Sequence, residues 1–451
     1  MLQTILSKEI QDLIEQHNWQ QLAKTRYAWP DPEIVAPEIV DVLIDLDPPD
    51  RALFFRALPR DLAVEVFSYL DPEHADELLV DLTDAETRRL ISEMSPDDRT
   101  ALLEELPGQV TQRLLNMLPA EDLRETRKLL GYPEDSVGRL MTPDYIKVRR
   151  EWTVRQALDH IRKIGEEDDE LSVIYVTNAR GRLVDAIPLT QLVLADPEQP
   201  LTDIMDYSFV CLSATDDQEE AVRVMHRYNR LMLPVIDTSG ILLGVVTIDS
   251  VMDVSEEEVT EDFHLSAAVT PLRTGYWDTS AFSLVRSRIG WLAVLVVVNL
   301  LSSGVIAAYE ETLEAVVVLA FFIPLIIDTG GNTGSQSATL MIRAMSIGDV
   351  KMDQWLRVFL KELLIGIAIG VILGVMGFGL GLWRGGPAIG LVVFLTMVTM
   401  LVITNLFGML LPFMLARVNA DPAIASGPLV TSLADAAGLL IYFSYAVMVL
   451  F

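Results

Sequence analysis

The chain has 451 residues, a mean hydropathy of +0.34 and a formal net charge of −30. From residue 285 onward it contains only 8 Lys and Arg and 9 Asp and Glu, so the first 284 residues have a net charge of −29. An acidic region followed by a nearly uncharged apolar one indicates a cytosolic part and a membrane part. The acidity excludes nucleic acid as a partner, because its recognition needs a basic surface, and favours cations.

Cysteine and histidine are scarce. The single cysteine, Cys211, excludes disulfides within the chain and any cysteine-based metal site. All five histidines precede residue 285, so the apolar part offers no imidazole ligand. The N-terminus has no basic segment followed by an apolar core, and we therefore predict no cleaved signal peptide.

Residues 40–120 contain an internal repeat of twelve residues. Its apolar positions are Leu46, Leu58, Leu70, Leu82, Met94, Leu106 and Leu118. Each is followed within two residues by Asp, Ser, Thr or Pro, which begin a helix and end the previous one. The repeat predicts a right-handed stack of helices of about two turns each, within an acidic helical-repeat N domain at residues 1–132.

Two similar halves follow, at residues 137–196 and 201–253. Each contains an amphipathic helix, at Thr153–Ile164 in the first half and at Asp217–Tyr228 in the second. An apolar strand, a turn containing glycine and a second strand come next in both halves. Units of this kind predict a paired α/β module.

The two halves resemble tandem CBS domains, a family that often binds adenine nucleotides between its halves. In that family an Asp three residues after a Ser or Thr usually holds the ribose. Here Ser250 stands three residues after Thr247, and Pro188 and Gln191 take the equivalent positions in the first half. These departures argue against ATP as a ligand but leave it as an alternative.

The next segment is strongly acidic. Seven carboxylates and no Lys or Arg occur within residues 249–262, namely Asp249, Asp253, Glu256, Glu257, Glu258, Glu261 and Asp262. Like charges one turn apart destabilise a helix, so this run needs counter-ions unless it is a solvated connector. We favour a sensor of divalent cations, because clusters of oxygen ligands suit magnesium or calcium. We expect residues 254–284 to form a connecting helix.

Residues 285–451 are predicted to form a membrane domain. Five apolar segments are close to the length that spans a bilayer, at residues 286–308, 313–328, 358–383, 388–416 and 424–450. With the N-terminus in the cytoplasm, seven of the eight basic residues of this domain lie on the cytoplasmic side. The positive-inside rule therefore predicts a cytoplasmic N-terminus and an outside C-terminus.

Polar residues interrupt these apolar segments at two places. Asp328–Gln336 combines three glycines with polar side chains and lacks the lysine of a phosphate loop, which predicts a helix break lining a transport path. Asp435 lies inside the last segment, where a carboxylate costs about 2.5–3.5 kcal/mol. We favour an ion-path residue over a packing residue. Gly366, Gly370 and Gly374 indicate close helix packing.

The segments Asp328–Arg343 and Asp421–Asp435, with the order of the domains, resemble the MgtE family of magnesium channels over essentially the whole chain. The resemblance implies a multi-domain membrane protein: an all-α helical-repeat N domain, α/β tandem CBS domains, a connecting helix and a five-helix transmembrane domain. It also implies a homodimer in the plasma membrane, in contact with lipid, with one pore on its axis. Mg²⁺ would enter the cell through this pore, and cytosolic Mg²⁺ would close it. No enzymatic activity is expected.

The resemblance also assigns roles to individual residues. Asp435 would hold the ion in the pore, Asn332 would line the path nearby, and Asp328 adds a carboxylate beside them. Glu65, Asp97 and Asp217 match positions that help to bind regulatory magnesium, whereas Ala101 and Arg227 stand where two further acids occur in relatives. The alternatives are a divalent-cation transporter coupled to protons or sodium, and a membrane-anchored ion or nucleotide sensor without transport.

Overall fold

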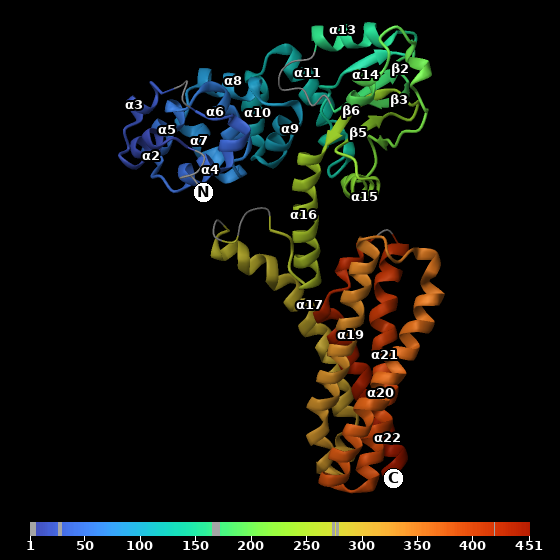
Figure 1. Ribbon diagram of the computed structural model, residues 1–451. Coiled ribbons are helices and arrows are strands. Elements are labelled where there is room, and N and C mark those ends of the chain that lie inside the picture. Colours follow the sequence, from blue (N-terminus) through green and yellow to red (C-terminus); the bar gives the residue numbers. More distant parts are fainter. Residues whose placement is uncertain (1–5, 26–28, 165–171, 273–275, 277–278, 419) are drawn as a thin grey trace. The chain divides into compact units, whose positions relative to one another are not determined.

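The computed structural model describes residues 6–25, 29–164, 172–272, 276, 279–418 and 420–451 (Figure 1). The chain divides into two compact units, Met1–Glu256 and Glu257–Phe451. The first contains a helical region followed by two small sheets, and the second contains the long apolar helices. The acidic helix α16, Ile248–Ser266, includes the boundary between the two units.

The first unit begins with a succession of short helices. They are α2 (Lys8–Glu15), α3 (Trp19–Leu22), α4 (Pro32–Ile44), α5 (Pro48–Ala57), α6 (Arg60–Ser68), α7 (Pro72–Asp81), α8 (Asp84–Glu93), α9 (Pro96–Glu105), α10 (Gly108–Met117) and α11 (Ala120–Leu129). The repeat predicted from the sequence is confirmed, because Leu58, Met94, Leu106 and Leu118 each end one helix. Their side chains are buried in one shared core.

Two three-stranded sheets follow, each with the same order of strands. They consist of β1 (Lys147–Arg149), β2 (Val173–Thr177) and β3 (Leu183–Pro188), and of β4 (Leu212–Ser213), β5 (Met232–Ile236) and β6 (Leu242–Thr247). The accompanying helices are α12 (Val137–Leu140), α13 (Val154–Ile164), α14 (Leu189–Leu194), η1 (Leu201–Asp203) and α15 (Gln218–Tyr228).

The two sheets confirm the predicted pair of similar halves. In each sheet the first strand pairs in parallel with the middle strand, which pairs antiparallel with the last. The hairpin turns place Gly181 and Gly240 at φ of 75° and 79°, a conformation that side chains disfavour. Glycine is therefore required at the same point of each half.

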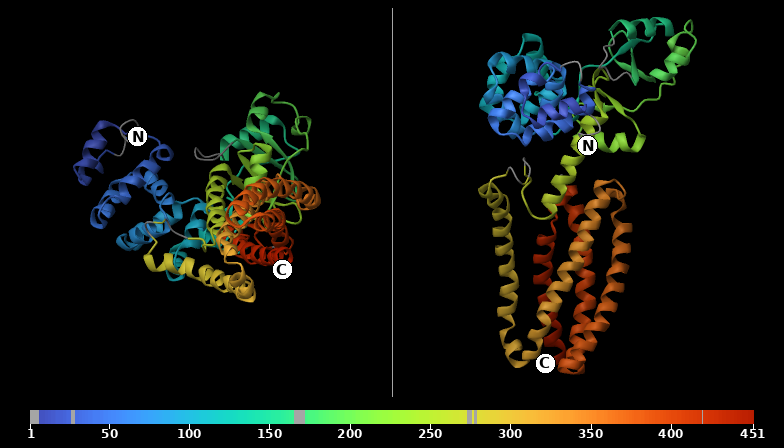
Figure 2. Two further views of the ribbon diagram at one scale, coloured as in Figure 1. Left: turned by 90° about the horizontal axis from the view of Figure 1, so that it is seen from below. Right: turned by 60° about the vertical axis from the view of Figure 1, so that its left-hand side comes forward.

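The second unit contains five helices that are long and apolar enough to cross a membrane, as the sequence predicts. These spans are α17 (Ala281–Ala308), η2 with α19 (Val317–Phe322 and Ile323–Ser346), η3 with α20 (Met352–Gln354 and Trp355–Gly385), α21 (Pro387–Arg417) and α22 (Gly427–Leu450). Two short elements, α18 (Glu310–Ala315) and η4 (Pro422–Ile424), lie between spans. Figure 2 shows the long helices running alongside one another as a bundle.

Helices α20 and α21 pack through a row of glycines. Gly366, Gly370 and Gly374 are buried against α21, as their spacing predicts. A Cβ atom at Gly370 would lie 3.1 Å from the backbone of Val398, and one at Gly381 would lie 2.6 Å from Gly390 Cα. The absence of side chains lets the two backbones approach closely.

The predicted break at Asp328–Gln336 is wrong, because these residues lie inside the continuous helix α19. The segment satisfies its polar groups without interrupting the helix. Thr329 donates to Leu325 O at 2.6 Å, and Thr333 donates to Thr329 O at 2.9 Å. The glycines face α21 and α22, where they allow close packing. The span thus extends to Ser346, instead of ending at residue 328.

The predicted connecting helix at residues 254–284 also needs correction. Helix α16 begins at Ile248 and ends at Ser266, and the first span begins at Ala281. Between them, residues 273–275 and 277–278 lie outside the described residues. Ala268, in the turn after the helix, has a φ of 58°. Alanine rarely adopts this left-handed conformation, and the apolar pattern of the sequence gave no sign of it.

The glycine row between α20 and α21 leads to a test of packing. We expect Gly381→Ala to destabilise the membrane unit by about 1–3 kcal/mol, because its methyl group would overlap the backbone at Gly390. Thermal unfolding of the purified protein in detergent measures the effect. The matched control is Gly379→Ala on the same helix, which meets no atom within 4 Å. Equal unfolding temperatures for the two variants would contradict the observed packing.

Candidate functional site

The residues of the candidate ion path lie where α19 packs on α22. Ser335 Oγ lies 3.0 Å from Thr431 Oγ1 and donates to Gly427 O at 3.1 Å. Nearer the start of α19, a Cβ at Gly331 would lie 2.6 Å from Thr431 Cγ2. Residue numbers fall along one helix as they rise along the other, so the two helices are antiparallel.

This register places Asp435 at the level of Asp328. A Cβ at Gly438 would lie 3.6 Å from Ile326 Cγ2, five residues along α19 and seven along α22 from the contact of Gly331 with Thr431. Asp435 lies between these two contacts, opposite Asp328, and the negative charges of the two side chains act on one another. The close approach at glycine therefore determines which carboxylates meet.

Asp435 is half-buried, and its Oδ1 atom is buried with no hydrogen-bond partner among the described residues. An unsatisfied polar atom of this kind is costly in an apolar environment, more so when it carries charge. Asp328 and Asn332 lie on the exposed side of α19, one turn apart. Two carboxylates and an amide thus lie within about one helical turn of one another along a membrane helix pair. Their oxygens are the ligand type that Mg²⁺ prefers.

The first unit holds a second group of acidic residues, which we call the acidic cluster. Asp97 from α9 meets the start of α16, where Ser250 Oγ lies 3.5 Å from its Oδ2 atom. The other carboxylate oxygen of Asp97 is buried without a hydrogen-bond partner in the described part of the chain. Tyr69 experiences the charges of four further members of the acidic cluster, which are Glu65, Asp98, Asp249 and Asp253.

Crowding in the acidic cluster disfavours the ionised carboxylates. Burial, and then the charges of Asp249 and Asp144, raise the pKa of Asp97. The pKa of Asp98 is raised to about 7, because the protein displaces water from the carboxyl group and Asp97 lies beside it. Burial and Asp249 also raise the pKa of Asp253. A cation bound here would reduce the repulsion between the carboxylates. It would also contact the buried oxygen of Asp97 that lacks a hydrogen-bond partner among the described residues.

The structure brings Glu65, Asp97, Asp249 and Asp253 together, but it does not bring Asp217 to them. Asp217 caps helix α15, where it accepts a hydrogen bond from Glu219 N at 2.9 Å. Its charge acts on Asp135, whose pKa is raised first by burial and then by Glu104. Capping alone explains an aspartate at position 217.

The remaining predicted acids lie farther along α16. Glu256, Glu257 and Glu261 are exposed, whereas Glu258 and Asp262 are half-buried. Asp262 Oδ2 accepts a hydrogen bond from Ser346 at the end of α19. Burial and the charge of Asp421 raise the pKa of Asp262.

Within the described residues, no three side chains of His, Cys, Asp or Glu are grouped closely enough to hold a metal ion. The acidic side chains of both sites are close enough to repel but do not form a closed cage. This arrangement fits a hydrated ion, because Mg²⁺ keeps several waters and binds proteins through one or two carboxylates.

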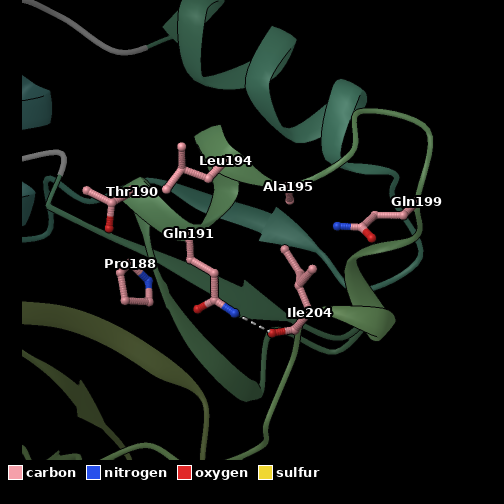
Figure 3. Close-up of a pocket in the computed structure, with 7 residues that line it drawn as sticks. All are labelled: Pro188, Thr190, Gln191, Leu194, Ala195, Gln199 and Ile204. Carbon is pink, nitrogen blue, oxygen red and sulfur yellow. Dashed lines mark hydrogen bonds between the residues drawn. The ribbon is translucent and has the colours of Figure 1, made fainter.

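The first CBS-like half contains a pocket of about 490 Å³ beside Pro188 and Gln191 (Figure 3). Its other lining residues are Thr190, Leu194, Ala195, Gln199 and Ile204, none of which is charged. Gln191 Nε2 donates to Ile204 O at 2.9 Å, so this amide is already engaged. The pocket offers no cation for a nucleotide phosphate. It therefore does not favour ATP at this position.

Several residues of these sites were not identified from the sequence. Asp98 follows the helix-start residues Ser95 and Pro96, and Asp421 lies in the segment that resembles the MgtE family. Glu362, inside α20, is a further carboxylate within a predicted span. The charge itself was the available signal for Glu362, because a carboxylate in a membrane helix is rare.

Comparison with known proteins identifies the domains of the chain. Residues 323–445 match the family model of the MgtE divalent cation transporter, and residues 35–135 match the MgtE intracellular N domain. Residues 137–198 and 201–257 each match the CBS domain.

Full-length relatives are also similar. The magnesium transporter MgtE of Thermus thermophilus is 38% identical over 93% of this chain and 94% of its own length. That of Bacillus subtilis is 32% identical over 90% and 92%. A crystal structure of the soluble part of a magnesium transporter is 24% identical, covers 56% of this chain and 98% of its own, and has a TM-score of 0.51. The chain belongs to the MgtE family, whose members are transporters and not enzymes.

Proposed function

We propose that this protein is a magnesium channel that mediates Mg²⁺ uptake across the plasma membrane and closes when cytosolic Mg²⁺ binds its acidic cluster. The observation that carries the proposal is Asp435, whose buried Oδ1 atom has no hydrogen-bond partner among the described residues and which lies near Asp328 on a pair of membrane helices. Relatives of nearly the same length are magnesium transporters, which supports Mg²⁺ as the transported ion.

The chemistry of the site favours a hydrated divalent ion. Asp328, Asn332 and Asp435 supply oxygen ligands from one side only, which leaves room for bound water. Mg²⁺ gives up its water reluctantly and suits such a half-open site. No cysteine or histidine occurs from residue 285 onward, so metals that prefer sulfur or nitrogen ligands gain little here.

We infer that the path forms between two copies of the chain. Asp328, Asn332 and Gln336 form an exposed polar row on α19. Lipid would leave this row unsatisfied, whereas a water-filled path on a two-fold axis would hydrate it. In such a homodimer two Asp435 side chains would face one hydrated ion, and lipid would contact the apolar outer surfaces.

The acidic cluster provides a sensor for cytosolic Mg²⁺. Glu65, Asp97 and Asp253 come from different helices, so repulsion between them favours a looser arrangement of the first unit. A bound cation stabilises the compact arrangement by its differential affinity. The negative charge continues along α16 through Glu256, Glu257, Glu258, Glu261 and Asp262. Asp262 accepts a hydrogen bond from Ser346 at the end of α19. We expect α16 to transmit the change to the path.

The orientation follows from charge. Arg343, Lys351, Arg357 and Arg417 lie at the ends of spans that we place on the cytoplasmic side, with the N-terminus. Five spans then place the C-terminus outside. Coupling to a proton or sodium gradient is the alternative, because an intramembrane Asp can also bind a proton. ATP remains a candidate ligand of the CBS pair, although the pocket beside Pro188 and Gln191 has no cationic side chain to bind its phosphates.

We expect Asp435→Asn to reduce Mg²⁺ flux by about tenfold or more, because the neutral amide binds a divalent cation more weakly by at least about 1.4 kcal/mol. Flux into liposomes containing the full-length protein, followed with a Mg²⁺ indicator, measures the change. The matched control is Asp353→Asn, an exposed acid outside the proposed path. Wild-type flux through Asp435→Asn would exclude the path. Flux that requires a proton or sodium gradient would instead indicate coupled transport.

The acidic cluster predicts an unusual pH dependence of stability. Because Asp97 and Asp98 have raised pKa values, the native state keeps protons that the unfolded state releases between about pH 4 and pH 7. Without Mg²⁺, the stability of the first unit should therefore fall as the pH rises through this range. Mg²⁺ should restore it at pH 7.5 much more than at pH 5.

Hydrogen exchange of α9 in the full-length protein, with and without Mg²⁺, measures this dependence. In the double variant Asp97→Asn with Asp98→Asn both the fall with pH and the stabilisation by Mg²⁺ should shrink. Asp84→Asn, at the start of the neighbouring α8, is the control and should behave as wild type. An unchanged response in the double variant would contradict the sensor.

A further inference from the structure

Glu362 is a further carboxylate within a membrane span, away from the candidate path. It lies on α20, two turns after the start of that helix. Asn405 on α21 donates from Nδ2 both to the backbone oxygen of Glu362 and to its Oε2 atom, each at 2.8 Å. Ser337 on α19 donates to the same Oε2 atom at 3.4 Å. One carboxylate oxygen thus joins three membrane helices.

The partners of Glu362 are enclosed by protein. Asn405 is 3% exposed and Ser337 is 4% exposed. Hydrogen bonds in such surroundings are costly to lose, because neither donor can turn to water. Glu362 forms no salt bridge within the described residues. Its hydrogen bonds come from Asn405 and Ser337, which are both uncharged.

Ser337 and the ion path occupy different sides of α19. Ser337 follows Asn332 by five residues, which rotates it by about 140° around the helix. Asn332 is exposed, whereas Ser337 is buried. Glu362 therefore holds α19 from behind, about 7.5 Å along the helix from the level of Asn332.

Glycine contacts and apolar side chains, such as Met341 of α19 and Met409 of α21, also hold these two helices together. Gly334 and Gly408 meet backbone to backbone, since a Cβ at Gly408 would lie 2.2 Å from Gly334 O. Glycine contacts set how closely two helices approach, and apolar packing requires no particular donor direction. The bonds at Glu362 oppose sliding and rotation of the helices, because each has a required length and direction.

We propose that Glu362 is a positioning residue for transport: it fixes the rotation and depth of α19 through Ser337 and Asn405. It thereby sets where Asn332 and Asp328 stand in the path. This proposal rests on the transport function proposed above. The role requires an oxygen acceptor at a certain reach and does not require a negative charge.

Two conservative variants separate reach from charge. Glu362→Gln keeps the length of the side chain and an acceptor oxygen, but loses the charge. Glu362→Asp keeps the charge but is one methylene too short to reach both donors. Ser337→Ala removes only the bond to α19 and leaves the two bonds of Asn405 in place.

The experiment measures flux in liposomes at increasing Mg²⁺ for these full-length variants, with the ratio of Mg²⁺ to Ca²⁺ flux as a second readout. We expect Glu362→Gln to stay within about twofold of wild type. Glu362→Asp and Ser337→Ala should raise the half-saturating Mg²⁺ concentration by about two- to thirtyfold, the range for one residue acting through another, and change the ion ratio. Thermal unfolding in detergent identifies loss of fold, in which case Ser337→Ala carries the test.

Two outcomes would overturn the proposal. Loss of transport in Glu362→Gln with normal transport in Glu362→Asp would assign a charge role, and wild-type behaviour of all three variants would exclude positioning. Asp435→Asn is measured in the same liposomes. If that variant is inactive while the Glu362 and Ser337 variants are normal, only the positioning role fails. If Asp435→Asn also transports normally, the proposed function itself fails.

Discussion

The close contact of α19 with α22 is the constraint on which the membrane site depends. Gly331 and Gly427 leave room for Thr431 and Ser335 to meet between the helices, and this contact fixes the antiparallel register. The register then sets Asp435 opposite Asp328. A bulkier residue at the contact would separate the helices and move the carboxylates apart. Small residues here serve function by determining where charge lies in the membrane.

The same physical principle operates in the acidic cluster of the first unit. A carboxylate that loses water without gaining a cation or a donor is held at a cost, as Asp97 and Asp435 both show through an unpartnered oxygen. In the first unit, the raised pKa values of Asp97 and Asp98 express this cost directly. We propose that a divalent cation is the partner that satisfies both sites. Under this proposal, transport and its control use one chemistry in two places.

Much of this architecture could be predicted from the sequence. The twelve-residue repeat predicted the short helices because Asp, Ser and Pro at helix starts act locally. The row from Gly366 to Gly374 likewise predicted a packing surface. The expected break near Gly330 failed, because glycine in a helix has two uses, and the choice between them depends on neighbours such as Met400 and Thr431. Only tertiary structure supplies those neighbours.

Some residues of the candidate site could likewise be predicted from the sequence, whereas others are brought together only by the tertiary structure. Asp435 stood out because an apolar run makes any charge conspicuous, and the acidic run predicted Asp249 and Asp253. The meeting of Asp97 with Ser250 joins residues 153 positions apart, which no local pattern encodes. Asp217 shows a different limit: the family resemblance suggests a ligand there, and the structure shows that the same side chain also caps α15.

We propose that the exposed row of α19 lines a water-filled path for Mg²⁺. The most direct test is thiol accessibility in membranes, using Asn332→Cys and Ser337→Cys in a protein whose single native cysteine, Cys211, is replaced by serine. If water fills this path, Asn332→Cys reacts with a charged, water-soluble reagent, and Mg²⁺ slows the reaction. The buried Ser337→Cys does not react. An unreactive cysteine at position 332, or a reaction rate that Mg²⁺ leaves unchanged, would contradict a water-filled path for Mg²⁺ along this row.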